Sequence, residues 1–176
     1  MYINKKGKKV QKQSSHRLRK LTNKRNNKID HYMHVSTKKI VDYCKQNNIN
    51  NVVLGRNRGW KQEVNIGKIN NQNFVDIPFN KFESYLTYKL QKEGFNIKIT
   101  EESYTSKCSA LDLESLCFHE KYLGERIKRG MFKSSDGTLI NADINGSLNI
   151  LRKEIGDDFI LSGIGLVVSP LKVTPL

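Results

Sequence analysis

Three carboxylate residues have the spacing that best suits chemistry. Glu101 and Glu102 are adjacent and close an apolar run, and Asp143 lies about forty residues later, where an apolar-periodic segment begins. Two acidic positions that bracket a polar insert are the layout of a metal-ion nuclease site assembled from distant segments. An aspartate in the first turn of a helix is also stabilised by the helix macrodipole. Local rules alone therefore favour a structural role for Asp143.

The elements around the glutamate pair are predicted to form a parallel β-α-β unit. Val52 to Leu54 reads as a short buried strand that ends at Gly55. A long polar segment with the only tryptophan, Trp60, follows, and it is either a ligand-contacting loop or a plain surface loop. Residues 78–93 have helical periodicity, and residues 95–99 alternate as a second strand. This order places Glu101 and Glu102 just past the carboxyl end of a parallel strand, where open α/β sheets place active sites.

The aspartate opens the last predicted helix. Asn141 is a good N-cap, and the apolar residues from Ile144 to Ile155 recur at helical spacing. A tail follows Gly156.

Residues 103–140 form the insert between the two acidic positions. Asp136–Gly137 predicts a two-residue hairpin turn, and short strands around turns resemble a zinc ribbon in outline. A zinc ribbon needs two pairs of soft metal ligands. Here Cys108 is followed, three positions later, by a leucine where the second ligand of its pair would stand, and two serines occupy the positions of the later pair. Cys117 and His119 are too isolated to replace those ligands. We therefore expect a small hairpin module without zinc.

Positive charge is concentrated at the N-terminus. The formal net charge is +14, and residues 1–40 hold thirteen lysines and arginines against one acid. Apolar residues at helical spacing predict a long helix from about His16 to Gln46, with a possible interruption at residues 26–27. Phosphate neutralisation makes DNA or RNA the natural partner of such an arm. The alternative is a solvated helical face packed on its own domain. The expected contacts are Arg17, Arg19, Lys20, Lys24, Arg25 and Lys28.

Other partners and compartments fit the sequence less well. The arm lacks the broad apolar face of a membrane-surface helix, and no run of residues is long enough to span a membrane. The basic N-terminus is not followed by the apolar region of a signal peptide. Three widely spaced cysteines fit a reducing compartment. We therefore expect a cytoplasmic, nucleoid-associated protein with no membrane partner.

Five segments together resemble one family. They are NVVLGRN, WKQEVNIGKINNQNFVDIPF, EESYTSK, RIKRGMFKSSDG and NADINGSLNIL. In this order and spacing they resemble the TnpB-type (OrfB-type) insertion-sequence proteins, the transposon-encoded relatives of type V CRISPR effectors. The resemblance covers about residues 8–170 and is strongest to the branch whose ribbon has lost its cysteines.

This resemblance implies a RuvC-like nuclease with an RNase H fold, in which three carboxylates hold two Mg²⁺ ions that act on a DNA phosphodiester. It makes Asp143 the third carboxylate. The second carboxylate of the family usually lies at the end of the strand that in this sequence ends at Gly55. The branch with the EESYTSK segment supplies this carboxylate from the next strand instead. The resemblance therefore implies Glu102 as the second carboxylate, with Glu101 as the second choice. The first carboxylate lies on a strand upstream of the basic helix, and this sequence does not contain it.

The resemblance also implies further nucleic-acid contacts. They lie in the long polar loop, at the edge of the carboxylate site and in the insert: Trp60, Lys61, Tyr104, Thr105, Ser106, Lys107, Arg126, Lys128 and Arg129. Asp143 and Glu102 are the expected ligands of a divalent, Mg²⁺-like ion, and Mg²⁺ is expected only where a complete site is assembled.

The expected architecture is an incomplete α/β fold of the RuvC/RNase H type that lacks its first strands. Residues 1–47 form the basic helical arm, 48–102 with 141–157 the core, 103–140 the ribbon-like insert and 158–176 the tail. The expected function is the C-terminal part of a transposon-encoded RNA-guided DNA endonuclease, with DNA and guide RNA as partners. One alternative is a non-catalytic DNA- or RNA-binding remnant. The other is a structural half that complements a separately encoded N-terminal part or a full-length homologue.

Overall fold

The computed structural model of the chain describes residues 2–3, 9–10, 15–56 and 78–161. These residues form a mixed α/β structure of helices and small sheets, as the sequence predicts. The elements in chain order are β1 (Tyr2–Ile3), β2 (Lys9–Val10), α1 (His16–Gln46), β3 (Asn51–Arg56), α3 (Phe79–Lys92), β4 (Asn96–Glu101), β5 (Glu125–Lys128), β6 (Met131–Lys133), β7 (Leu139–Asn141), α4 (Ala142–Ile155) and α5 (Asp158–Leu161).

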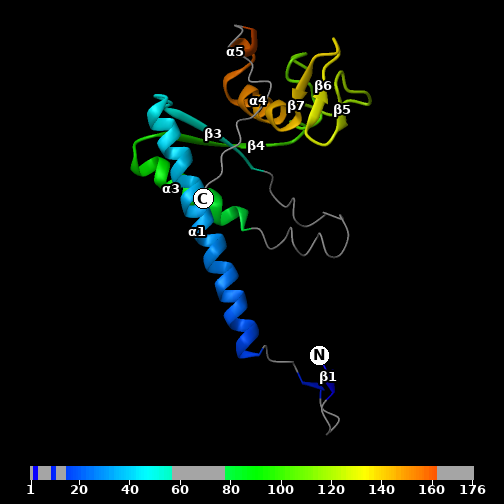
Figure 1. Ribbon diagram of the computed structural model, residues 1–176. Coiled ribbons are helices and arrows are strands. Elements are labelled where there is room, and N and C mark those ends of the chain that lie inside the picture. The colour runs from blue at the N-terminus through cyan, green and yellow to red at the C-terminus, as the bar shows by residue number, and fades with distance from the viewer. Residues whose placement is uncertain (1, 4–8, 11–14, 57–77, 162–176) are drawn as a thin grey trace.

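The long basic helix, α1, is 31 residues long and continuous. Ser15 caps it by accepting a hydrogen bond from the Leu18 N–H. The possible interruption at residues 26–27 is wrong, because asparagine costs a helix less than about 0.7 kcal/mol per residue. Within the described residues, the buried side chains of α1 are Met33, Thr37, Val41 and Cys44, all in its C-terminal half. The N-terminal half extends away from the β3–β4 strand pair (Figure 1).

The β-α-β unit is present, and its strands are parallel. β3 pairs with β4 in register, from Asn51 opposite Asn96 to Arg56 opposite Glu101. One core cluster fixes the unit against α1 and consists of Val41, Cys44, Leu86 and Leu90. β3 is longer than predicted and only partly buried rather than buried. Within the part of the chain that the structure describes, the sheet that contains β3 has two strands, so each strand has a neighbouring strand along only one of its two edges.

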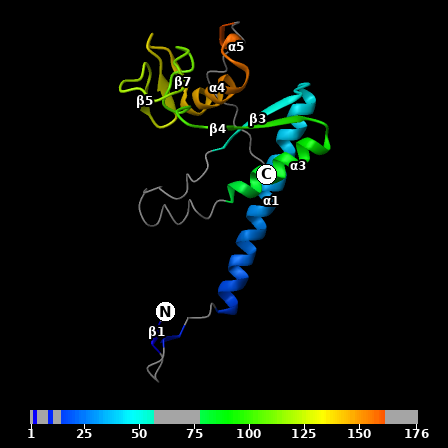
Figure 2. The same cartoon turned by 180° about the vertical axis from the view of Figure 1, so that it is seen from behind.

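Helix α4 covers the other side of this strand pair (Figures 1 and 2). Ile150 of α4 lies over Gly55 of β3. Glu154 accepts a hydrogen bond from the Thr100 hydroxyl and forms an ion pair with Lys98, both in β4. The strand pair therefore lies between α1 and α3 on one side and α4 on the other.

The insert contains a three-stranded antiparallel sheet, β5-β6-β7, that leads directly into α4. Phe132, Ile140 and Ala142 form its small core. The two-residue turn lies at Arg129–Gly130 rather than at Asp136–Gly137, since Lys128 pairs with Met131. The Asp136 turn is wider, because Ser134 and Thr138 still pair across it. Asp136 holds it by accepting hydrogen bonds from the Ser134 hydroxyl and the Thr138 N–H.

Among the helices that the structure describes, none is both long and apolar enough to cross a membrane.

Candidate functional site

Glu101 is the last residue of β4, rather than one just past the strand, and its side chain is held by neighbours. Its carboxylate accepts hydrogen bonds from the N–H and hydroxyl of Ser103. Lys153 of α4 lies 3.2 Å from the same carboxylate and also donates to the main-chain oxygens of Glu101 and Ser103. The Ser103 hydroxyl, followed by Lys153, lowers the pKa of Glu101 despite the opposing effect of desolvation. Glu101 is therefore an exposed carboxylate already engaged in a local network.

Glu102 has a different environment, although it is the next residue. Its half-buried side chain occupies the space where a side chain on Gly55 would lie. Any residue larger than glycine at position 55 would collide with the Glu102 carboxylate and with Ile150. Burial raises the pKa of Glu102, and the negative charge of Glu101 adds to this effect while Lys153 opposes it. Within residues 15–56 and 78–161, no side chain donates a hydrogen bond to this carboxylate.

Asp143 lies in the first turn of α4, and its side chain is 88% exposed. Asn141 caps the helix by accepting hydrogen bonds from the N–H groups of Asp143 and Ile144, as predicted. Arg126 of β5 approaches the Asp143 carboxylate to 4.0 Å. The residue that packs beside Glu102 is Ile150, seven positions later, which is about 10 Å along the helix axis.

The three acids thus lie on two neighbouring elements, the end of β4 and the start of α4. Within the described ranges, no group of three or more His, Cys, Asp or Glu residues is arranged to hold a metal ion. Carboxylate oxygens are the ligands that Mg²⁺ prefers in proteins. Glu101 is engaged by Lys153 and Asp143 is approached by Arg126, whereas Glu102 forms no ion pair within the described ranges.

The segment after the acids, residues 104–107, is only partly on the surface. Tyr104, Ser106 and Lys107 are exposed, and Lys107 lies 5.9 Å from the centre of the Tyr122 ring. Thr105 is buried, and its hydroxyl donates to the Glu102 main-chain oxygen at 2.8 Å. The predicted contacts Arg126, Lys128 and Arg129 are exposed on β5 and on the turn that follows it.

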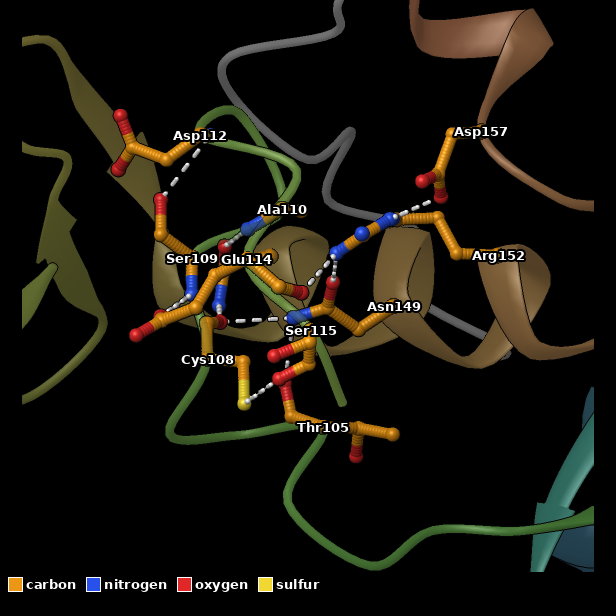
Figure 3. Close-up of polar contacts among 11 residues, drawn as sticks. Thr105, Cys108, Ser109, Ala110, Asp112, Glu114, Ser115, Asn149, Arg152 and Asp157 are labelled. Carbon is orange, nitrogen blue, oxygen red and sulfur yellow. Dashed lines mark hydrogen bonds and ion pairs between the residues drawn. The ribbon is translucent and has the colours of Figure 1, made fainter. Parts of the chain in front are cut away.

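Charged groups that bond to the main chain brace the insert. Glu114 is buried and accepts hydrogen bonds from the N–H groups of Ser109, at 2.7 Å, and Leu123, at 2.8 Å. Asp112 accepts from the N–H and hydroxyl of Ser135 in the β6–β7 turn. Figure 3 shows Ser109, Asp112 and Glu114 beside α4. These bonds join segments of the insert that are up to 23 residues apart in the sequence.

The two cysteines of the insert face different surroundings. Cys108 is fully buried, and its thiol contacts the Ser115 main-chain oxygen at 3.3 Å. Cys117 is exposed and lies 3.5 Å from the His119 Nε2. Burial raises the pKa of the Cys108 thiol, and the charge of Glu114 adds to this effect.

The basic arm presents its charges to solvent. All six predicted contacts between Arg17 and Lys28 are exposed. A hollow of about 1080 Å³ lies beside this half of α1. Its lining includes the cationic side chains of Lys20, Lys24 and Lys28 and the aromatic ring of Tyr32. Trp60 and Lys61 lie outside the described residues.

Sequence reasoning missed a set of buried polar residues on α4. Asn145 and Asn149 are fully buried, and Arg152 is nearly so. All three donate hydrogen bonds to main-chain oxygens of the insert. The available signal was their spacing, since intervals of four and three residues put all three on one helix face.

Comparisons with known proteins assign this architecture. Residues 3–61 match a family model described as a probable transposase, OrfB of IS605, and residues 79–150 match one described as the Cas12f1-like TNB domain. The chain is a TnpB-type relative of the type V effectors. The family resemblance seen in the sequence is therefore confirmed.

A solved structure shows the same fold. The chain is similar to a chain in a cryo-EM structure of a Cas12f1–sgRNA–target DNA complex, with a TM-score of 0.60 and 22% sequence identity. The match covers 77% of this chain and 36% of that chain, so the 176 residues span about a third of the relative. No curated protein matches the chain.

The contrast between the two glutamates predicts separate titrations. Carboxyl-carbon NMR should show Glu101 titrating below its ordinary pKa and Glu102 above it. A raised folded pKa means that the native state binds the extra proton, so the contribution of Glu102 to stability falls as pH rises from its unfolded to its folded pKa. Urea unfolding at pH 7 should therefore show no loss of stability in Glu102→Gln. A clear loss in that variant would contradict the desolvation of Glu102.

The bracing of the insert by Glu114 predicts a stability effect. Glu114→Gln replaces one of the two accepting carboxylate oxygens with an amide NH₂ group that faces a hydrogen-bond donor. We expect the free energy of unfolding to fall by about 1–3 kcal/mol. Urea unfolding followed by circular dichroism measures it. Glu120→Gln, the same change at an exposed residue, is the matched control and should alter stability by less than about 0.5 kcal/mol. Equal effects would show that the Glu114 bonds do not brace the insert.

Proposed function

We propose that the chain contributes two carboxylates, Glu102 and Asp143, to an Mg²⁺-dependent DNA nuclease site of the RuvC type. The observation that carries this proposal is the position of Glu102. The Glu102 carboxylate fills the space above Gly55, where the family resemblance expects the second acid to originate. An acid just past the end of β4 would thus replace one from β3, on the side of the strand pair that faces α4.

The environments of the acids support distinct roles. Glu101 is neutralised by Lys153 and Ser103, so it shapes the site without binding metal. Glu102 and Asp143 would hold Mg²⁺, which activates a water and stabilises the leaving oxygen of a phosphodiester. The third acid would come from residues outside these 176, either in a longer protein or in a separate chain. The strand pair and α4 would then form part of an incomplete RNase H-like core, with residues 103–140 as a ribbon-derived insert.

Charge distribution supports nucleic acids as partners. The exposed half of α1 would contact phosphates, and Arg126 and Lys128 on β5 would carry a strand toward Asp143, which Arg126 approaches. The related Cas12f1 structure contains an sgRNA and a target DNA. We extend both classes to this chain, with RNA-guided DNA cleavage in a transposition setting as its activity. A DNA partner would place the protein at the nucleoid.

A second candidate function is nucleic-acid binding without cleavage. It is favoured by the lack of a three-residue metal-binding group in the described ranges. In this case the chain would be a binding remnant or a structural half that completes another copy of the family. Cleavage and binding assays separate the two candidates.

For cleavage, the chain is combined with a TnpB-type N-terminal fragment that carries the first-strand aspartate, guide RNA and target DNA. With Mg²⁺, we expect Asp143→Ala and Glu102→Gln each to lower the rate at least about a hundredfold, because loss of an outer-shell partner alone costs 10- to 100-fold. Glu101→Gln is the matched control and should retain most activity. Loss of activity in Glu101→Gln but not in Glu102→Gln would reverse our assignment of the two glutamates.

For binding, the affinity of the chain for duplex DNA is measured by fluorescence anisotropy across salt concentrations. Replacing Lys20, Lys24 and Lys28 with glutamine should reduce the slope of log affinity against log salt by about 3, since each phosphate contact contributes about 0.9.

The matched control for this assay removes the same charge from lysines that already have acidic partners. Lys45, Lys81 and Lys98 pair with Glu93, Asp30 and Glu154. Their replacement by glutamine should leave the slope nearly unchanged. If the two triple variants behave alike, the arm is not the phosphate-binding surface.

A further inference from the structure

One face of α4 carries amide side chains that have no contact with solvent. Asn145 and Asn149 are both 0% exposed. Buried amides are costly unless their hydrogen bonds are satisfied, so their partners show what this face is built to hold. Those partners are main-chain groups of the loop that follows Glu102 (Figure 3).

Asn149 uses its whole side chain. Its Nδ2 donates to the main-chain oxygen of Thr105 at 2.9 Å and to that of Cys108 at 2.7 Å. Its Oδ1 accepts from the Arg152 Nη1 at 2.8 Å, and Arg152 in turn donates to the main-chain oxygen of Glu114 and pairs with Asp157. The amide is thus fixed in orientation and holds Thr105 at a set distance from α4.

The same loop residue holds Glu102. The Thr105 N–H and hydroxyl both donate to the Glu102 main-chain oxygen, at 3.2 and 2.8 Å. Tyr104, which lies between Glu102 and Thr105, has a φ of 63°. This left-handed backbone conformation is unfavourable for non-glycine residues and persists where the surrounding structure imposes it. A continuous chain of hydrogen bonds therefore runs from α4 through Asn149 and Thr105 to Glu102.

Helix α4 also carries Asp143, six residues before Asn149. A helix is rigid over this distance, so whatever Asn149 holds is held at a fixed position relative to Asp143. The two acids come from segments about forty residues apart in the sequence, and this hydrogen-bond chain joins them directly.

We propose that Asn149 is a positioning residue that sets the Glu102 carboxylate relative to Asp143 for divalent metal binding. The metal part of this inference rests on the proposed function, whereas the hydrogen-bond chain does not. Asn145 provides a contrast on the same face, because it bonds to the Cys108 oxygen and the Ala110 N–H but not to Thr105. It anchors the insert without holding Glu102.

The experiment compares Asn149→Asp with Asn145→Asp in the full 176-residue chain. Each change keeps the shape of the side chain and removes its N–H donors at a buried site, so both variants should lower the melting temperature. Only Asn149→Asp should speed hydrogen exchange of the Thr105 amide, by about tenfold, as measured by NMR. Equal exchange rates at Thr105 in the two variants would overturn the proposal.

Mn²⁺ binding tests the link to metal, and it is followed by electron paramagnetic resonance in the chain combined with the N-terminal fragment of the cleavage assay, which supplies the third acid. We expect Glu102→Gln and Asn149→Asp to weaken Mn²⁺ binding, the latter about tenfold, and Asn145→Asp to leave it within about twofold of the parent chain. If Glu102→Gln weakens binding and Asn149→Asp does not, the positioning role is wrong. If Glu102→Gln has no effect, the proposed metal site is wrong, and the Thr105 exchange rates still decide whether Asn149 holds Glu102.

A second variant serves if Asn149→Asp does not fold. Thr105→Val is nearly isosteric and removes only the hydroxyl bond to the Glu102 main-chain oxygen. It should weaken Mn²⁺ binding about threefold while the melting temperature changes little. Unchanged Mn²⁺ affinity in Thr105→Val would overturn the proposal.

Discussion

The requirement that buried polar groups be hydrogen-bonded shapes the contact between the insert and α4. The insert shares a small core with this helix, in which Ile144 and Leu148 pack against Phe132 and Ile140. Beside this core, α4 donates hydrogen bonds from Asn145, Asn149 and Arg152 to main-chain oxygens of the insert. A buried oxygen left without a donor costs about 1–3 kcal/mol, so these bonds fix one docking geometry. This arrangement attaches the insert to α4 through side-chain bonds to its main chain.

The geometry of the parallel strand pair positions the two glutamates. The ends of both strands lie at one edge, so a side chain just past the end of β4 can occupy space that a residue of β3 leaves empty. Glycine at position 55 leaves that space, and Glu102 fills it. The cost is a partly desolvated carboxylate whose pKa is raised. A raised pKa beside an exposed acidic partner is a common property of functional sites, where a bound cation would offset the unfavourable burial.

The two halves of the basic arm, α1, have different environments. Its C-terminal half is fixed by apolar contacts and by Lys89, which donates to the His34 main-chain oxygen and the Thr37 hydroxyl. Its N-terminal half exposes Leu18, Leu21 and a dense set of cations. Such a surface suits a polyanion that neutralises the charge along the helix. The exposed cations of the arm and the carboxylates therefore lie on different elements of the chain.

The sequence by itself determined the elements and the chemical types. Helical periodicity predicted α1 and, with Asn141 as the cap, α4, and the strand–helix–strand order predicted the parallel pair, because these signals are local. Only the tertiary structure distinguished Glu101 from Glu102, since their environments depend on Lys153, Gly55 and Ile150, which are distant in sequence. It also revealed Asn149 as a hydrogen-bond donor to the loop after Glu102. Spacing within an element shows which residues share a face, but only packing between elements shows what that face meets.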